Sequence, residues 1–188
     1  MATKPTIHRA TVDLSDVDRG VYEKLSMSLA RADSETAERL IVRLLAYCLC
    51  YQDGIRFTGG VSSGDEPDVW VTELAPGMGE RVKLWIEVGL PEAKRLLKAA
   101  RHCRHVVLFA YGKKRGKWES DHLDELRQRD NITVLGVDLT AFARLIDALE
   151  RQIAWSLTVS GGTIYLTAGD QHIETTLEHV VGPPLFTD

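Results

Sequence analysis

The chain has 188 residues, of which 44% are hydrophobic and 27% charged, a balance typical of one globular domain spanning residues 1–188 rather than of a disordered chain. Its formal net charge of −4 at pH 7 argues against a protein coated with phosphate-binding surface, and leaves room for a local basic patch. There is no apolar run long enough to span a bilayer and no signal-peptide core, and the three cysteines lack zinc-ligand spacing, so we expect a cytoplasmic protein without membrane contacts.

The N-terminal part of the chain predicts a hairpin followed by a helix. Polar and apolar residues alternate over 5–14 and again over 21–31, which indicates two antiparallel strands. Ser34 is a typical N-cap, and the apolar stripe that follows predicts a helix reaching Tyr51. A loop-rich stretch comes next, with room for one short strand at 55–59.

The rest of the chain alternates strands with helices and ends in strands. The predicted elements are strands 67–74 and 82–88, helix 91–102, strand 104–111, helix 117–129, strand 132–138, helix 139–151, a hairpin of strands 153–159 and 163–168, and a last strand near 172–178. From the second of these strands onward the order is β-α-β-α-β-α, which predicts parallel pairing with right-handed crossovers. We therefore expect an α/β domain with a β-hairpin at each end.

The two central strands, which form a hairpin, carry a pair of acidic residues. A symmetric turn at the tip of this hairpin places Asp68 opposite Glu87. The same register places Trp70 opposite Trp85, and all four side chains then share one face because side chains alternate along a strand. Directly opposed carboxylates repel each other, so something must offset their charge: a divalent cation, a shared proton or a basic side chain. The alternative is a bulge or a longer turn that shifts the register and turns both acids to solvent.

Further charged residues lie close to this hairpin in the sequence. One face of helix 91–102 carries Lys94, Lys98 and Arg101. These side chains either form a solvated face or extend toward the carboxylates. Glu35 and Glu38 lie at the start of the first helix, where they either favour the helix dipole or add oxygen ligands. Carboxylate ligands select Mg²⁺ or Mn²⁺, which would activate water for attack on a phosphoryl group while a lysine neutralises the developing charge.

Several phrases in this sequence resemble the YaeQ family. They are SET at 34–36, ER at 38–39, RLLA at 43–46, DEPDxW at 65–70, LWIExGLP at 84–91 and KA at 98–99. That family is similar in fold to the PD-(D/E)XK nuclease superfamily, so the resemblance implies a restriction-endonuclease-like core, a mixed sheet flanked by helices in the order αβββαβ.

The resemblance also implies roles for individual residues. Asp68 matches the aspartate of the "PD" position and Glu87 the second acid, while Glu35 or Glu38 matches the acid on the first core helix. The nuclease motif expects a lysine two residues after the second acid, and this chain has Gly89 there.

In some relatives of the nucleases the lysine lies on the following helix. Lys94 or Lys98 would then take its place, with Arg95 as a weaker candidate.

Three hypotheses follow. The leading one is a metal-dependent phosphodiesterase that acts on nucleic acid, with Mg²⁺ or Mn²⁺ on Asp68 and Glu87. The second is a binding protein that kept the fold and lost turnover, as the glycine at the lysine position suggests. The third is a protein-interaction module that uses its terminal hairpins as edge strands. The basic stretch 112–118 either contacts a phosphate backbone, with Trp118 available for stacking, or forms a solvated turn.

Overall fold

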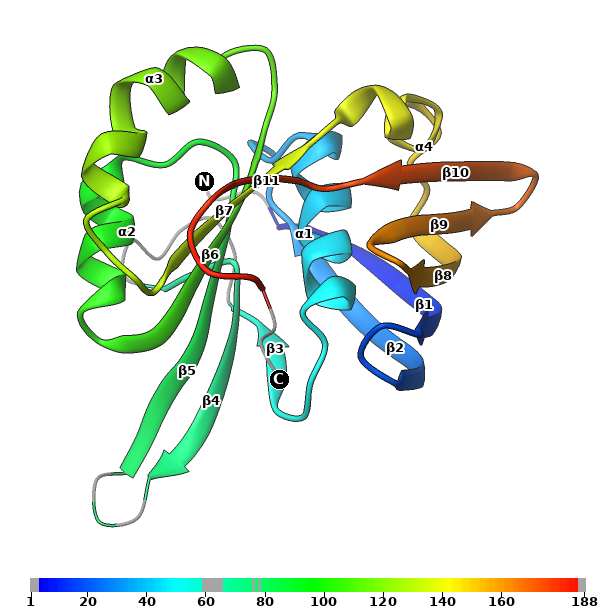
Figure 1. The fold of residues 1–188 in the computed structure, drawn as a ribbon. Coiled ribbons are helices and arrows are strands. Elements are labelled where there is room, and N and C mark those ends of the chain that lie inside the picture. The colour runs from blue at the N-terminus through cyan, green and yellow to red at the C-terminus, as the bar shows by residue number, and fades with distance from the viewer. Residues whose placement is uncertain (1–3, 59–65, 76, 78, 186–188) are drawn as a thin grey trace.

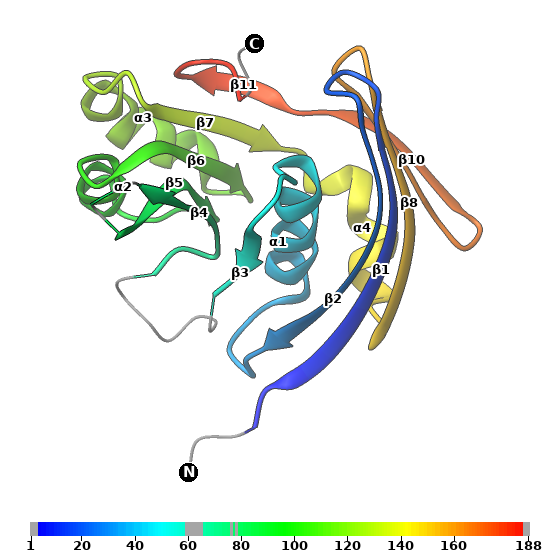
Figure 2. The same cartoon turned by 90° about the horizontal axis from the view of Figure 1, so that it is seen from below.

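The computed structural model describes residues 4–58, 66–75, 77 and 79–185. These residues form two β-sheets that face each other across a central helix (Figures 1 and 2). Within this part of the chain, no helix is long and apolar enough to cross a membrane.

The five-stranded sheet joins the two ends of the chain. It has the order β10-β9-β8-β1-β2, with bounds β1 Thr6–Asp16, β2 Val21–Arg31, β8 Gln152–Ser160, β9 Thr163–Ala168 and β10 Gln171–Thr176. Both predicted hairpins are present, as β1 with β2 and β8 with β9. A parallel pairing of β1 with β8, which the sequence did not predict, makes them one sheet.

The six-stranded sheet carries the candidate site. It has the order β11-β7-β6-β5-β4-β3, with bounds β3 Ile55–Phe57, β4 Val69–Ala75, β5 Gly79–Val88, β6 Cys103–Tyr111, β7 Ile132–Val137 and β11 Glu178–Val181. Strands β5, β6 and β7 are parallel, as predicted, and β3, β4 and β11 run antiparallel to their neighbours.

The helices cover the six-stranded sheet on both faces. They are α1 Ala37–Leu49, α2 Ala93–Ala100, α3 Arg115–Leu126, the 3₁₀ helix η1 Leu139–Phe142 and α4 Ala143–Asp147. Helix α1 lies between the two sheets, and α2 and α3 lie on the outer face of the six-stranded sheet (Figure 2). The order α1-β3-β4-β5-α2-β6 is the αβββαβ order that the sequence led us to expect.

Two apolar clusters fill the layers. The larger lies between the sheets, where Leu40, Leu44 and Leu45 of α1 are fully buried against inward-facing residues of both sheets. The smaller joins α2 and α3 to the outer face of the six-stranded sheet through residues such as Leu96 and Val106. The apolar stripe predicted on the first helix is therefore the centre of the molecule.

Each predicted helix differs from the observed one. The predicted helices 91–102 and 117–129 differ only at their ends, and the other two differ in how they begin or continue. The first begins at Ala37 because Thr36, not Ser34, is its N-cap: the Thr36 hydroxyl accepts the backbone N–H of Arg39 at 3.2 Å. Glu35 therefore precedes the helix. The predicted helix 139–151 is split into η1 and α4, since the Asp138 carboxylate caps the Thr140 N–H and starts a tighter 3₁₀ turn.

Candidate functional site

The β4–β5 hairpin has the predicted register at the site. Trp70 pairs with Trp85, and Val69 with Ile86, so the register puts Asp68 beside the end of β5. Nearer the tip the pairing is shifted by one residue, and a bulge between Val71 and Thr72 compensates for it. The predicted register is therefore confirmed at the site, while the predicted symmetric turn is wrong.

Asp68 is held at both carboxylate oxygens. Its Oδ2 accepts the backbone N–H of Val88 at 2.8 Å, and its Oδ1 accepts Nη2 of Arg39 at 2.5 Å. Its own N–H donates to the Ile86 carbonyl at 3.0 Å. Only 5% of the residue is exposed, so Asp68 bridges the two central strands and α1 in a nearly dry environment.

Glu35 is neutralised by two arginines of α1. Arg39 Nη1 lies 3.2 Å from Oε1, and Arg43 Nη2 donates to Oε2 at 3.1 Å. Arg43 is 1% exposed, and it also donates to the Ala30 carbonyl. Desolvation of the charged guanidinium lowers the pKa of Arg43, and the negative charge of Glu35 opposes that effect. Arg39 thus connects Glu35 with Asp68.

Glu87 is held from the other side of the sheet. Its Oε1 accepts the indole N–H of Trp85 and Nε of Arg95, each at 2.8 Å. Arg95 also donates to the Glu66 carbonyl and lies over the Trp85 ring. Burial raises the pKa of the Glu87 carboxyl, the nearby charge of Asp68 raises it further, and Arg95 opposes both effects.

The structure brings together three of the predicted acids and leaves both predicted lysines exposed. Glu35, Asp68 and Glu87 are buried, Glu38 is half-buried on α1, and both Lys94 and Lys98 are exposed on α2. The cation on Glu87 is Arg95, which the sequence placed behind the two lysines.

Sequence reasoning assigned no role to Arg39, Arg43 or Tyr111. Arg39 and Arg43 follow Glu35 by one and two helical turns, and this spacing is the signal that could have identified them. Tyr111 ends β6, and its phenol has a pKa raised to about 12, chiefly by burial, with the charge of Arg39 opposing the increase.

Each of the three buried acids is paired with an arginine in this structure. Over the described ranges of the chain there is no group of three or more His, Cys, Asp or Glu that could hold a metal ion. Arg39 reaches Asp68 from α1 and Arg95 reaches Glu87 from α2, on opposite faces of the sheet. One carboxylate oxygen of Asp68 and one of Glu87 are therefore bonded to a guanidinium group.

Comparisons with known proteins agree with the resemblance seen in the sequence. The model of the YaeQ protein family matches residues 1–177. The uncharacterized protein YaeQ of Salmonella typhi is 34% identical over 178 residues, covering 94% of this chain and 96% of the relative. The chain belongs to the YaeQ family.

Solved YaeQ structures have the same fold. The YaeQ protein from Pseudomonas syringae superposes with a TM-score of 0.89 at 35% identity, covering 95% of this chain and 97% of that one. The YaeQ protein from Xanthomonas axonopodis pv. citri gives 0.88 at 32% identity, covering 95% and 99%. The mixed α/β fold with two mixed sheets is therefore the YaeQ fold.

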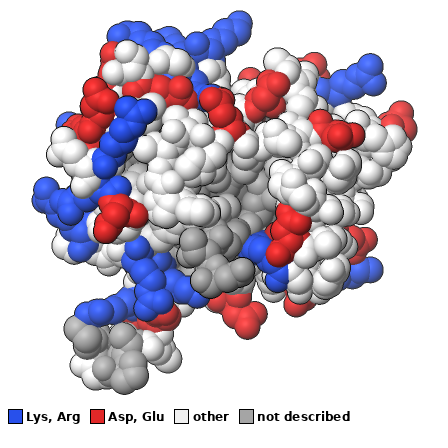
Figure 3. Space-filling view, viewed as in Figure 1, with Lys and Arg blue, Asp and Glu red and all other residues white. Residues whose placement is uncertain are grey.

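The basic surface of this YaeQ protein lies beside the buried acids. Lys94, Lys98 and Arg101 are exposed along α2, which begins next to Glu87. Figure 3 shows Lys and Arg side chains gathered over α2 and the β4–β5 hairpin. A cavity of about 400 Å³ adjoins the end of α2 and is lined by Glu73, Arg81, Val82, Arg101, His102, Cys103 and Arg104.

The basic stretch 112–118 offers no stacking platform. Trp118 is 7% exposed, and its indole N–H donates to the Pro91 carbonyl at 2.7 Å, so the idea that Trp118 stacks on a ligand is wrong. Arg115 pairs with Glu119 and Glu178 across the end of the sheet. The turn is therefore used to anchor α3.

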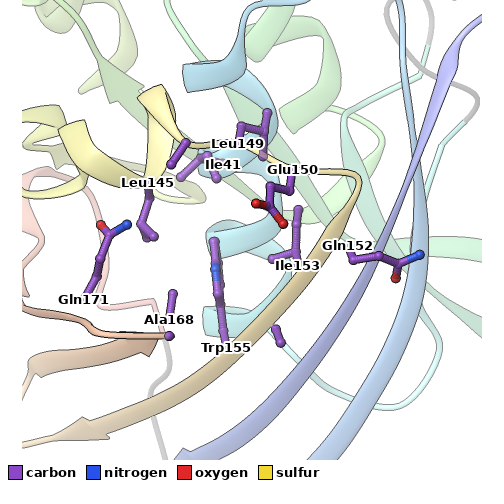
Figure 4. Close-up of a pocket in the computed structure, with 12 residues that line it drawn as sticks. Ile41, Leu145, Leu149, Glu150, Gln152, Ile153, Trp155, Ala168 and Gln171 are labelled. Atoms are coloured by element: carbon purple, nitrogen blue, oxygen red, sulfur yellow. The ribbon is translucent and has the colours of Figure 1, made fainter.

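A second hollow of about 290 Å³ lies between α1, α4 and the five-stranded sheet. Figure 4 shows Leu145, Ile153 and Trp155 around it, with the Glu150 carboxylate pointing inward. Apolar walls with a few polar groups suit a small organic molecule. The residues that line it include no lysine or arginine, so the hollow is not suited to phosphate.

Proposed function

We propose that this YaeQ protein binds nucleic acid through a restriction-endonuclease-like core of the PD-(D/E)XK type, and that it does so without metal-dependent cleavage. The observation that carries the proposal is the arginine on each buried acid: Arg39 and Arg43 on Glu35, Arg39 on Asp68, and Arg95 on Glu87.

The arginines make a metal-bound state expensive. A divalent cation would have to displace Arg39 from Asp68 and Arg95 from Glu87. Separating a buried charge from its partner typically costs about 3–5 kcal/mol. Three acids facing three arginines also leave no net charge for a cation to neutralise. The cluster supports a structural role, which joins α1 and α2 to the central hairpin.

The backbone at Gly89 supports the loss of catalysis. Its φ is +105°, in the region that side-chain-bearing residues avoid, and its N–H donates to the Phe109 carbonyl at 3.0 Å. A lysine at this position would carry a backbone strain of about 1–3 kcal/mol. The chain conformation itself therefore disfavours the lysine of the nuclease motif.

The basic row on α2 supports nucleic acid as the ligand. Lys94, Lys98 and Arg101 are exposed on one helix face, within reach of a common backbone. Phosphate contacts by such side chains supply most of the sequence-independent affinity for nucleic acids. A chain of net charge −4 gains such affinity only where basic residues are gathered on one surface.

One observation favours the second candidate, a phosphodiesterase that uses Mg²⁺ or Mn²⁺. The charge of Asp68 raises the pKa of Glu87, so the two carboxylates lie near enough to repel, and a shared cation would relieve that repulsion. In that function Glu35 or Glu38 would add an oxygen ligand, and Lys94 or Lys98 would neutralise charge on the phosphoryl group.

Titration calorimetry of Mn²⁺ and Mg²⁺ separates the two candidates. We expect no heat of binding in the wild type, in Asp68→Asn or in Glu87→Gln. We also expect a fluorescent single-stranded oligonucleotide to bind equally well with Mg²⁺ or with a chelator.

A matched pair of double variants tests the surface. Replacing Lys94 and Lys98 by Gln should weaken binding of the oligonucleotide about tenfold or more, since each lost phosphate contact removes counterion release. Replacing the exposed Lys113 and Lys114 by Gln should leave it unchanged. Metal heat that disappears in both acid variants, together with metal-dependent cleavage, would instead establish the phosphodiesterase.

A further inference from the structure

The cavity at the end of α2 combines residues from β4, β5, the turn after α2 and the start of β6. Arg81 comes from the start of β5, Arg101 and His102 follow α2, and Arg104 lies at the start of β6. The volume of about 400 Å³ is large enough for a phosphate group and the sugar that carries it. The cavity lies at the end of β5 opposite to Glu87, so it is separate from the buried acids.

The charges in the cavity favour an anion. Three guanidinium groups line it, and its one acid, Glu73, pairs with Arg104 at 3.2 Å. A guanidinium group can bind two phosphate oxygens at once through short, charge-assisted hydrogen bonds. The side chain of Arg104 is 70% exposed, so it can turn from Glu73 to a ligand with little rearrangement.

The end of α2 does not oppose an anion as a bare helix C-terminus would. The Ala99 carbonyl accepts the His102 N–H at 2.9 Å and the Cys103 thiol at 3.1 Å. The Ala100 carbonyl accepts the side-chain amide of Asn131 at 2.9 Å. Because these carbonyls already have donors, the negative end of the helix dipole is largely satisfied beside the cavity.

We propose that this cavity binds the terminal phosphate of a nucleic-acid strand whose backbone lies along α2, an inference that rests on the proposed function. The basic row leads from Lys94 to Arg101 over about 10 Å, from the helical rise of about 1.5 Å per residue. A strand laid along this row would bring its phosphates within reach of these three side chains. A terminal phosphate carries a charge close to −2, against −1 for an internal one, and three arginines select for that difference.

Fluorescence anisotropy with one oligonucleotide in three forms tests this inference. The strand carries a 5′-phosphate, a 3′-phosphate or neither, with the dye at the opposite end or within the strand. We expect one phosphorylated form to bind the wild type at least about tenfold more tightly than the unphosphorylated form, as charge-assisted hydrogen bonds provide.

Variants of exposed residues assign the effect to the cavity. Arg81→Gln and Arg104→Gln should remove the preference for the phosphorylated strand. The exposed Arg151→Gln, just before β8 of the other sheet, should keep it. Glu73→Gln should increase the preference, because it removes the acid and releases Arg104. A gain of affinity in this variant also shows that it is folded.

Two outcomes would overturn the inference, and they differ from a failure of the proposed function. Equal binding of all three strands would show that the cavity does not bind a terminal phosphate, while the proposal of nucleic-acid binding would stand. Failure of every strand to bind would remove both. If inorganic pyrophosphate then bound to the wild type and not to Arg104→Gln, the cavity would belong to a free phosphate compound instead.

Discussion

At the scale of single residues, opposing effects act on the pKa of the Glu87 carboxyl. Burial and the charge of Asp68 disfavour its ionised form, while Arg95 and the Trp85 indole favour it. The net result is a raised pKa, so the disfavouring effects dominate. The cost of burying this carboxylate next to Asp68 therefore exceeds what Arg95 and Trp85 offset.

The raised pKa of Glu87 predicts how stability depends on pH. Between the unfolded value of about 4.3 and the higher folded value, the folded chain binds more protons, so the contribution of Glu87 to the free energy of unfolding falls as pH rises. Urea unfolding of the wild type and of Glu87→Gln across this range should give a difference that declines with pH. A difference that grows with pH would contradict the prediction.

The acids of the candidate site could be predicted from the sequence, and most of their partners could not. Asp68 and Glu87 follow from hairpin geometry, which depends on local register. Arg39 and Arg95 depend on where α1 and α2 pack against the sheet, which the sequence does not specify. Arginine has a long side chain that reaches many positions from one helix, so its partner is known only when the helices are placed.

At the scale of elements, β11 closes one edge of the six-stranded sheet. Its residue Glu178 pairs with Gly136 of β7, and the Arg115 side chain lies where a Cβ at Gly136 would be. Arg115 in turn binds Glu178, so α3, β7 and β11 meet at this glycine. Covering an edge in this way protects the sheet from pairing with other chains.

The end of β11 offers a test of that edge. Gly182 has a φ of +97°, and a Cβ there would lie 1.9 Å from the Ile132 carbonyl oxygen. We expect Gly182→Ala to lower the free energy of unfolding by about 3 kcal/mol or more, from backbone strain plus a forced shift of β11. Gly161→Ala, where φ is also positive but nothing lies within 4 Å of the added Cβ, should cost only about 1–2 kcal/mol. Equal losses in urea unfolding would show that β11 adapts freely.

Element type was predictable where periodicity is long, and element ends were not. The buried parallel strands β6 and β7 read as unbroken apolar runs, so their nature followed from composition alone. The predicted last strand is in fact two, β10 and β11, which belong to different sheets. Their division at Leu177 was not predicted: β10 alternates, whereas the four residues of β11 do not.

At the scale of the whole molecule, charge is unevenly distributed. The net charge is −4, yet the row on α2 and the neighbouring cavity collect Lys94, Lys98, Arg101 and Arg104 on exposed surface. Each contact with a phosphate releases a condensed counterion, so this distribution determines how binding responds to salt. The negative net charge of the chain then weakens binding of nucleic acid at low salt, while the exposed basic row still provides affinity.

The salt dependence of nucleic-acid binding therefore reports the number of phosphate contacts. Four contacts with a single strand predict a slope of log K against log salt of about −3, at roughly 0.7 per contact. Replacing Lys94 and Lys98 by Gln should reduce the slope to about −1.4. Replacing Lys113 and Lys114 by Gln should leave the slope as it is, and a wild-type slope near zero would contradict a backbone contact on α2.

The pairing of β1 with β8 has a consequence for how the protein is made. His8 hydrogen-bonds to the Glu150 carbonyl, 142 residues further along the chain, where these two strands begin their parallel pairing. During synthesis the β1–β2 hairpin leaves the ribosome with one long edge open, and its partner β8 is translated only more than a hundred residues later. The six-stranded sheet is completed later still, because its strand β11 follows β8 in the chain. Neither sheet can therefore be completed before its late strand, β8 or β11, has been translated, and the nascent chain is the form of this protein with most need of a chaperone.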